Sequence, residues 1–123
     1  MVDKEKRIQE ILKKYDRIYN FTKDQRFEIY LGLLNNIDVD LYAKEYFDVN
    51  QMYEIRKGLE MKLDVSTYAD PYYNWMQMEQ IRHGLMCGLD ISKYSDPTYS
   101  WDKMNTIRLE LWEQKECPLK NNK

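Results

Sequence analysis

The stretch VSTYADPYYNWMQMEQIRHGL (Val65–Leu85) decides the fold, because ISKYSDPTYSWDKMNTIRLEL (Ile91–Leu111) repeats it 26 residues later without a gap. An earlier copy has its matching residues one period upstream, at Tyr42, Met52, Ile55, Arg56 and Leu59. A fainter copy begins near Phe21. We therefore read residues 21–117 as about four repeat units.

Each unit predicts a long helix preceded by a short one. Good N-cap residues recur at Thr22, Asp48, Asn74 and Ser100. Glutamines that would complete a capping box follow three residues later at Gln25, Gln51 and Gln77. The shorter helix, which carries the recurring tyrosine, is expected to be capped by Asp40, Ser66 or Ser92. Gly88, Asn36 and Lys62 occupy the position of a left-handed C-terminal cap.

The long helices have one apolar stripe each, which in one unit consists of Met52, Ile55, Leu59 and Leu63. A single unit cannot bury this stripe, so the units are expected to stack as a small all-α solenoid. Gly58 and Gly84 lie inside helices and off the stripe, which predicts a close backbone approach between neighbours there.

The first residues predict a separate helix that caps the stack. Residues 3–19 place their apolar side chains on one face, at Ile8, Ile11, Leu12, Tyr15, Ile18 and Tyr19. We therefore expect a single helical-repeat domain over residues 1–117, with a capping helix over 1–20 and repeats over 21–117. The polar residues 118–123 are expected to form a flexible tail.

Composition bounds the class of protein. With 43% apolar residues, eleven tyrosines and three tryptophans, the chain is expected to fold, and a net charge of −2 gives no general attraction to nucleic acid. The start, MVDKEKRIQE, lacks the apolar core of a signal peptide, and no apolar run is long enough to span a membrane. We therefore expect a cytoplasmic protein, either of the encoding organism or of a host cell.

The recurring charged and aromatic residues have two interpretations. Arg56, Arg82 and Arg108 could form a phosphate-binding row, but pairing with recurring aspartates (Asp64, Asp90, Asp70 or Asp96) or stacking on tyrosines is the favoured prediction. The rings recur in register with the core leucines, which favours a structural role over base stacking for Tyr68, Tyr94, Trp75 and Trp101.

Catalytic chemistry has no visible basis in the sequence. The single histidine, His83, has no partner at a metal-ligand spacing, and no glycine-rich phosphate loop or nucleophile motif is present. We therefore predict a non-enzymatic protein with no cofactor and no metal.

The positions that differ between units are the better candidates for binding. They share one face of each long helix, here called the variable face, and repeat proteins often bind partners with such residues. The candidates are Tyr53, Lys57, Glu60, Met61, Glu79, His83, Met86, Asn105, Leu109 and Trp112. Burial of this face within the fold, or in a homodimer, is the alternative.

The motif Q-M-x-x-I-R-x-G-L-x-x-G-L-D-I-S-K-Y-S-D-P, read from Gln77 to Pro97, resembles a short helical repeat of phage, plasmid and integrative-element proteins in Firmicutes-type bacteria. The resemblance covers roughly residues 47–111 and transfers no functional residue. It implies a mobile-element protein that binds a host defence effector, as anti-CRISPR proteins do.

The leading hypothesis is thus a protein-binding helical-repeat module. A nucleic-acid binder that uses the arginine row and the basic first helix is the alternative, with Lys4, Lys6, Arg7, Lys13, Lys14 and Arg17 as its basic residues. A structural, homo-oligomeric module is the third hypothesis.

Overall fold

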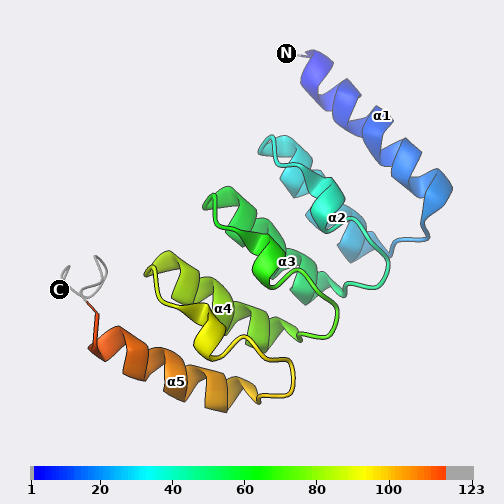
Figure 1. The fold of residues 1–123 in the computed structure, drawn as a ribbon. Helices are drawn as coiled ribbons and strands as arrows, with labels where there is room; N and C mark the ends of the chain where they lie inside the picture. Colours follow the sequence, from blue (N-terminus) through cyan, green and yellow to red (C-terminus); the bar gives the residue numbers. More distant parts are fainter. Residues whose placement is uncertain (1, 116–123) are drawn as a thin grey trace. The chain divides into compact units, whose positions relative to one another are not determined.

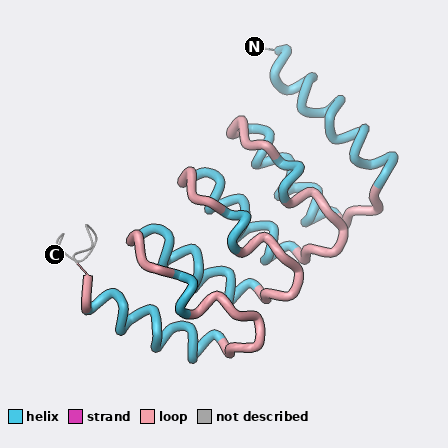
Figure 2. Tube along the Cα trace, viewed as in Figure 1, coloured by secondary structure: helices cyan, strands magenta, loops and turns pink. Residues whose placement is uncertain are grey.

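The computed structural model describes residues 2–115, and within them the chain is all-α, with no strand. Five α-helices and three short 3₁₀-helices alternate with loops (Figure 1; Figure 2). In chain order these are α1 (Val2–Ile18), α2 (Lys23–Leu34), η1 (Val39–Leu41), α3 (Val49–Glu60), η2 (Val65–Thr67), α4 (Trp75–Met86), η3 (Ile91–Lys93) and α5 (Trp101–Glu113). The predicted all-α helical-repeat fold is confirmed.

The chain divides into two compact units: unit 1 is Met1–Met61 and unit 2 is Lys62–Lys123. In unit 1, α2 packs against both α1 and α3, and in unit 2, α4 packs against α5 (Figure 1). Within both units the contacting helices are therefore neighbours in sequence, as expected of stacked repeats. The predicted tail, residues 118–123, lies outside the described residues.

The capping boxes form as predicted and also connect successive repeats. The Thr22 hydroxyl accepts from the Gln25 backbone N–H at 3.1 Å, while the Gln25 side chain accepts from the Thr22 N–H at 2.9 Å. The same Gln25 amide donates to the Phe47 carbonyl at 2.7 Å, in the loop before α3. In unit 2, Gln77 repeats this with the Tyr99 carbonyl at 2.6 Å. One side chain therefore fixes both a helix start and the next loop.

The short helices differ from the prediction. They are single turns of 3₁₀-helix, and their N-caps are Asp38, Asp64 and Asp90 rather than Asp40, Ser66 and Ser92. Each aspartate accepts from a backbone N–H two residues ahead, and this local bond suits a turn too short for an i+3 cap. The left-handed positions are as predicted, with φ of 60° at Asn36, 60° at Lys62 and 65° at Gly88.

Gly84 makes room for a tyrosine side chain, not for a neighbouring backbone as predicted, and Gly32 does the same. The Tyr94 hydroxyl donates to the Gln80 carbonyl at 2.6 Å, and a Cβ added to Gly84 would overlap that hydroxyl. Tyr42 makes the same bond at 2.7 Å with the Glu28 carbonyl and lies against Gly32. Burial raises the pKa of both phenols, so both stay neutral donors.

The core follows the repeat pattern with two exceptions. Most of the fully buried side chains are recurring ones, among them Tyr42, Tyr68, Tyr94, Met52, Met78, Met104, Ile55 and Ile81. Trp75 and Trp101, predicted to pack structurally with them, instead lie exposed at the first turns of α4 and α5. Ile18, predicted on the buried face of the first helix, is the last residue of α1 and is 71% exposed.

Candidate functional site

The variable face of unit 1 exposes apolar side chains. Tyr53 on α3 and Met61, which directly follows α3, are each 41% exposed, and on the neighbouring α2, Phe27 is 57% and Leu34 is 38% exposed. Lys57, half-buried, lies 5.8 Å from the centre of the Tyr53 ring. An amphipathic helix normally presents charged residues on the side away from its core, so this face is unusually apolar.

Glu60, which is predicted to contact a partner, is half-buried and also takes part in an ion-pair network. Its carboxylate accepts from Arg56 Nη1 at 2.6 Å and from the Asn35 side chain at 3.1 Å. Arg56 Nε donates to Glu28, on α2, at 2.7 Å. The side chain of Arg56 is only 10% exposed and that of Glu28 only 11%. We call this cluster of Arg56, Glu28 and Glu60 the Arg56 site.

The partners of Arg56 also correct the prediction of an aspartate. The aspartates of the repeat are used to cap the 3₁₀-helices and turns, whereas a glutamate has the reach to meet the guanidinium on the adjacent helix. Burial alone would lower the pKa of Arg56, but the Glu28 and Glu60 carboxylates outweigh it and raise that pKa. The Arg56 charge is thus fully compensated.

In unit 2, three predicted residues line one pocket. His83 and Met86 from α4 and Trp112 from α5 surround a cavity of about 200 Å³, together with Cys87 and Arg108. Arg108 had been predicted as structural only. We call this cavity the Arg108 pocket.

The Arg108 guanidinium is held by neutral groups. Its Nε donates to the Gln80 side chain at 2.8 Å and its Nη2 donates to Asn105 at 2.9 Å. It forms no ion pair within residues 2–115 and is half-buried between α4 and α5. The predicted contact residue Asn105 is therefore part of the support of Arg108.

The remaining predicted residues of unit 2 lie beside this pocket. Leu109 is 42% exposed on α5, and Glu79 is half-buried on α4. Burial lowers the pKa of His83, the charges of Arg82 and Arg108 lower it further, and Glu79 partly opposes them. The imidazole thus experiences a positive local field.

Arg82, the third recurring arginine, is 9% exposed, and its Nη1 lies 3.7 Å from the Met86 sulfur. With Arg56 buried as well, the recurring arginines do not present an exposed row of charge.

Exposed aromatic rings also occur outside the variable face. Tyr46 in unit 1 is 60% exposed, and in unit 2 Tyr72 is 80%, Trp75 is 37% and Trp101 is 43% exposed. These rings lie in or next to the loops that precede the long helices. We call these four residues the loop edge.

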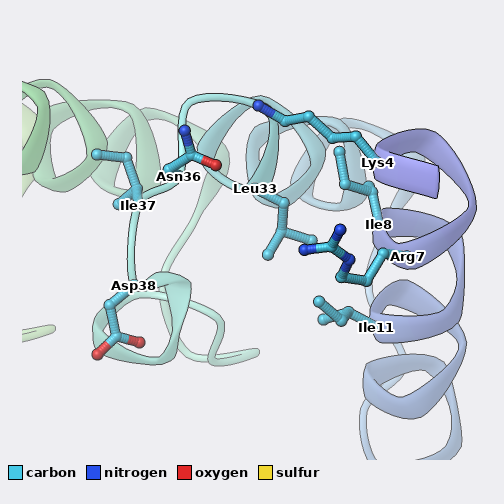
Figure 3. A pocket seen from close by; sticks show the side chains of 8 residues that line it. All are labelled: Lys4, Arg7, Ile8, Ile11, Leu33, Asn36, Ile37 and Asp38. Atoms are coloured by element: carbon cyan, nitrogen blue, oxygen red, sulfur yellow. The ribbon is translucent and has the colours of Figure 1, made fainter. Parts of the chain in front are cut away.

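A cavity of about 380 Å³ lies in unit 1. Its lining is formed by Lys4, Arg7, Ile8, Ile11, Leu33, Asn36, Ile37 and Asp38. Figure 3 shows the α1 side chains projecting toward Leu33, while the Asp38 carboxylate points away from them. Two of the six basic residues predicted for nucleic-acid contact therefore lie here, over an apolar floor.

The sequence did hold a signal for the role of Arg108. Two periods separate Arg56 from Arg108, and the same shift carries Glu28 to Gln80 and Glu60 to Trp112. Both carboxylates of the Arg56 site are thus replaced by neutral residues. The informative residue lies 28 positions upstream of each arginine: it is Glu28 for Arg56 and Gln80 for Arg108. A comparison of the recurring arginines with each other does not reveal this difference.

No group of three or more His, Cys, Asp or Glu side chains in residues 2–115 is placed to hold a metal ion. None of the helices in this part of the chain is long and apolar enough to span a membrane. Comparison of the chain with protein-family models, with curated proteins and with solved structures found no match.

Proposed function

We propose that this chain is a protein-binding helical-repeat module whose partner contacts the variable face. The observation that carries the proposal is the exposure of large apolar residues at the non-recurring positions, namely Phe27, Leu34, Tyr53, Met61 and Leu109. Exposed apolar residues that gather on one face, rather than singly, are typical of protein interaction surfaces. The resemblance to mobile-element repeats suggests a bacterial defence effector as the partner.

The arrangement of charge favours a protein over a nucleic acid. Phosphate contacts require accessible Lys or Arg side chains. Arg56 and Arg82 are buried, and Arg56 is neutralised by two glutamates. The basic residues of α1 remain accessible, but acidic residues are interspersed among them.

The test uses two variants with four substitutions each. The face variant carries Lys57→Glu, His83→Ala, Met86→Ala and Trp112→Ala, and the control carries Tyr46→Ala, Tyr72→Ala, Trp75→Ala and Trp101→Ala at the loop edge. Partners captured from a bacterial lysate by the wild type are identified, purified and titrated by calorimetry against all three proteins.

The face variant should lose at least about tenfold in affinity, because truncating central interface residues commonly costs more than 1 kcal/mol each. The control should bind like the wild type. Full-strength binding by a folded face variant, or loss in the control alone, would refute the assignment to the variable face. A gel shift with DNA and RNA at rising salt tests the alternative, and salt-dependent binding there would favour it.

A further inference from the structure

Arg56 and Arg108 occupy equivalent positions in the repeat but differ in the charged groups around them. The Arg56 site has a carboxylate on each side, at 2.7 and 2.6 Å. Shifting that site by two periods gives Gln80 and Trp112 in the places of the two glutamates. The Arg108 pocket is therefore the same scaffold position without its anions.

A half-buried guanidinium without a counter-charge is an unfavourable arrangement in a folded chain. Removing an ion from water costs several kcal/mol unless an opposite charge compensates it. Gln80 and Asn105 satisfy two nitrogens of Arg108 but supply no negative charge. The pKa of the neighbouring His83 is lowered chiefly by burial, then by the charges of Arg82 and Arg108.

The cavity has the size and walls for one side chain. Its volume of about 200 Å³ is below the roughly 300–1,000 Å³ typical of small-molecule sites. The sulfur of Met86 and the ring of Trp112 supply apolar walls beside the charge. The bonds from Gln80 and Asn105 also fix the guanidinium in place, which lowers the entropic cost of binding.

We propose that the Arg108 pocket binds an acidic side chain of the partner protein, with the carboxylate on Arg108 and the aliphatic stem against Trp112 and Met86. This inference rests on the proposed function, because it specifies the chemistry of the partner.

A polyphosphate ligand is disfavoured by the surroundings of the pocket. Residues 62–115 hold six Lys or Arg and eight Asp or Glu, a net charge of −2. A single carboxylate meets the one arginine, whereas a nucleic-acid backbone would bring many charges to an acidic surface.

The test does not require the partner protein to be identified. The blocked peptide acetyl-Ala-Leu-Glu-Leu-Ala-amide, its Gln counterpart and inorganic phosphate are titrated into the full chain. The Arg108 Nε–H and Trp112 indole N–H signals are followed by NMR. The Glu peptide should shift both signals saturably and bind at least about tenfold more tightly than the Gln peptide, because hydrogen bonds to charged groups are worth about 1.5–3 kcal/mol.

Two variants and one control complete the test. Arg108→Gln should remove the preference for Glu over Gln, and Trp112→Glu should do the same by supplying within the chain the carboxylate that Glu60 supplies in unit 1. Lys93→Gln, which removes an exposed charge elsewhere in unit 2, should leave the preference unchanged. If Arg108→Gln fails to fold, Trp112→Glu still decides the matter.

Equal affinities for the two peptides, or no shift at all, would overturn the proposal. A larger response to phosphate than to the Glu peptide would identify a phosphate site instead and would also overturn it. These failures are separate from that of the proposed function, because a partner could still bind the apolar variable face while the pocket prefers no carboxylate. If the face variant lost its partner while the wild type bound both peptides equally, the proposed function would stand and the pocket proposal would fail.

Discussion

The Arg56 site and the Arg108 pocket place the same residue on the same scaffold and use it differently. In unit 1 the guanidinium lies between two carboxylates with about a tenth of its side chain exposed. In unit 2 it has amide partners and faces a cavity. Between the two sites, both glutamates are replaced by uncharged residues. The arginine charge that is paired in unit 1 therefore has no opposite charge beside it in the described part of unit 2. Recurrence of a residue therefore does not establish that its role recurs.

The largest expected effect is the loss of a carboxylate from the Arg56 site. Glu28→Ala should lower the free energy of unfolding by about 3 kcal/mol, because it leaves a buried charge short of a partner. Gln80→Ala, the equivalent change in unit 2, should cost about 1.5 kcal/mol, since it removes a hydrogen bond between Arg108 and a neutral group.

Urea unfolding followed by circular dichroism measures both changes. The exposed Glu10→Ala serves as the control and should stay within about 0.5 kcal/mol of the wild type. Equal losses in the free energy of unfolding for Glu28→Ala and Gln80→Ala would contradict the conclusion that Arg56 depends on a buried ion pair and Arg108 does not.

Both units contain a contact between a buried tyrosine hydroxyl and a helix glycine. Gly32→Ala and Gly84→Ala should each cost about 2–3 kcal/mol, because the added methyl group would displace a buried tyrosine hydroxyl. Thermal unfolding of the two variants should show similar losses. In the Tyr94→Phe background Gly84→Ala should cost clearly less, and additive effects in this double-mutant cycle would argue against the contact.

Gln80→Glu should make unit 2 resemble unit 1. The new carboxylate would meet Arg108 and raise stability by roughly 1 kcal/mol at neutral pH, since the pair is only partly buried. The gain should disappear as pH falls and the carboxyl group protonates. The neutral Gln80→Met serves as the matched variant, and destabilisation by Glu at neutral pH would show that Arg108 needs no negative charge.

The smallest effect concerns His83. Its pKa is lowered by burial and by Arg82 and Arg108, so the neutral imidazole is favoured in the folded state. Its contribution to stability is therefore present above the unfolded value of about 6.5 and is lost as pH falls through the lower folded value. NMR titration should find the pKa below 6.5 in the wild type and higher in Arg108→Gln. An unchanged value would place the Arg108 charge too far away to act.

The fold was largely predictable because its period is written in the sequence. The N-caps, the capping-box glutamines and the left-handed residues follow from local backbone chemistry, which acts at fixed offsets. The 3₁₀ caps were missed because Asp38 and Ser66 both suit a cap, and only the turn geometry separates them. The prediction for Trp75 was wrong because a recurring ring can lie on the surface of every unit as well as in its core.

The candidate site was predictable only in part. His83, Met86 and Trp112 were expected to share a face, and they do line one pocket. Their neighbour Arg108 was not expected there, because its environment depends on Gln80, which lies 28 residues upstream on another helix. The ion pair of Glu60 was not predicted either, because it joins a non-recurring residue to the recurring Arg56.

The hydrogen bonds that connect repeats have a consequence for the length of the protein. Gln25 and Gln77 each reach 22 residues ahead, Tyr42 and Tyr94 reach 14 back, and Arg56 and Arg108 reach 28 back. These spans depend only on position within the period. A duplication or deletion of one whole 26-residue segment would therefore restore every class of bond at its seam, whereas most other insertions inside a unit would break several. Chain length is thus open to change in whole steps, and a step copied from a unit with Arg56, Arg82 or Arg108 adds an arginine that its neighbours can either neutralise or leave available.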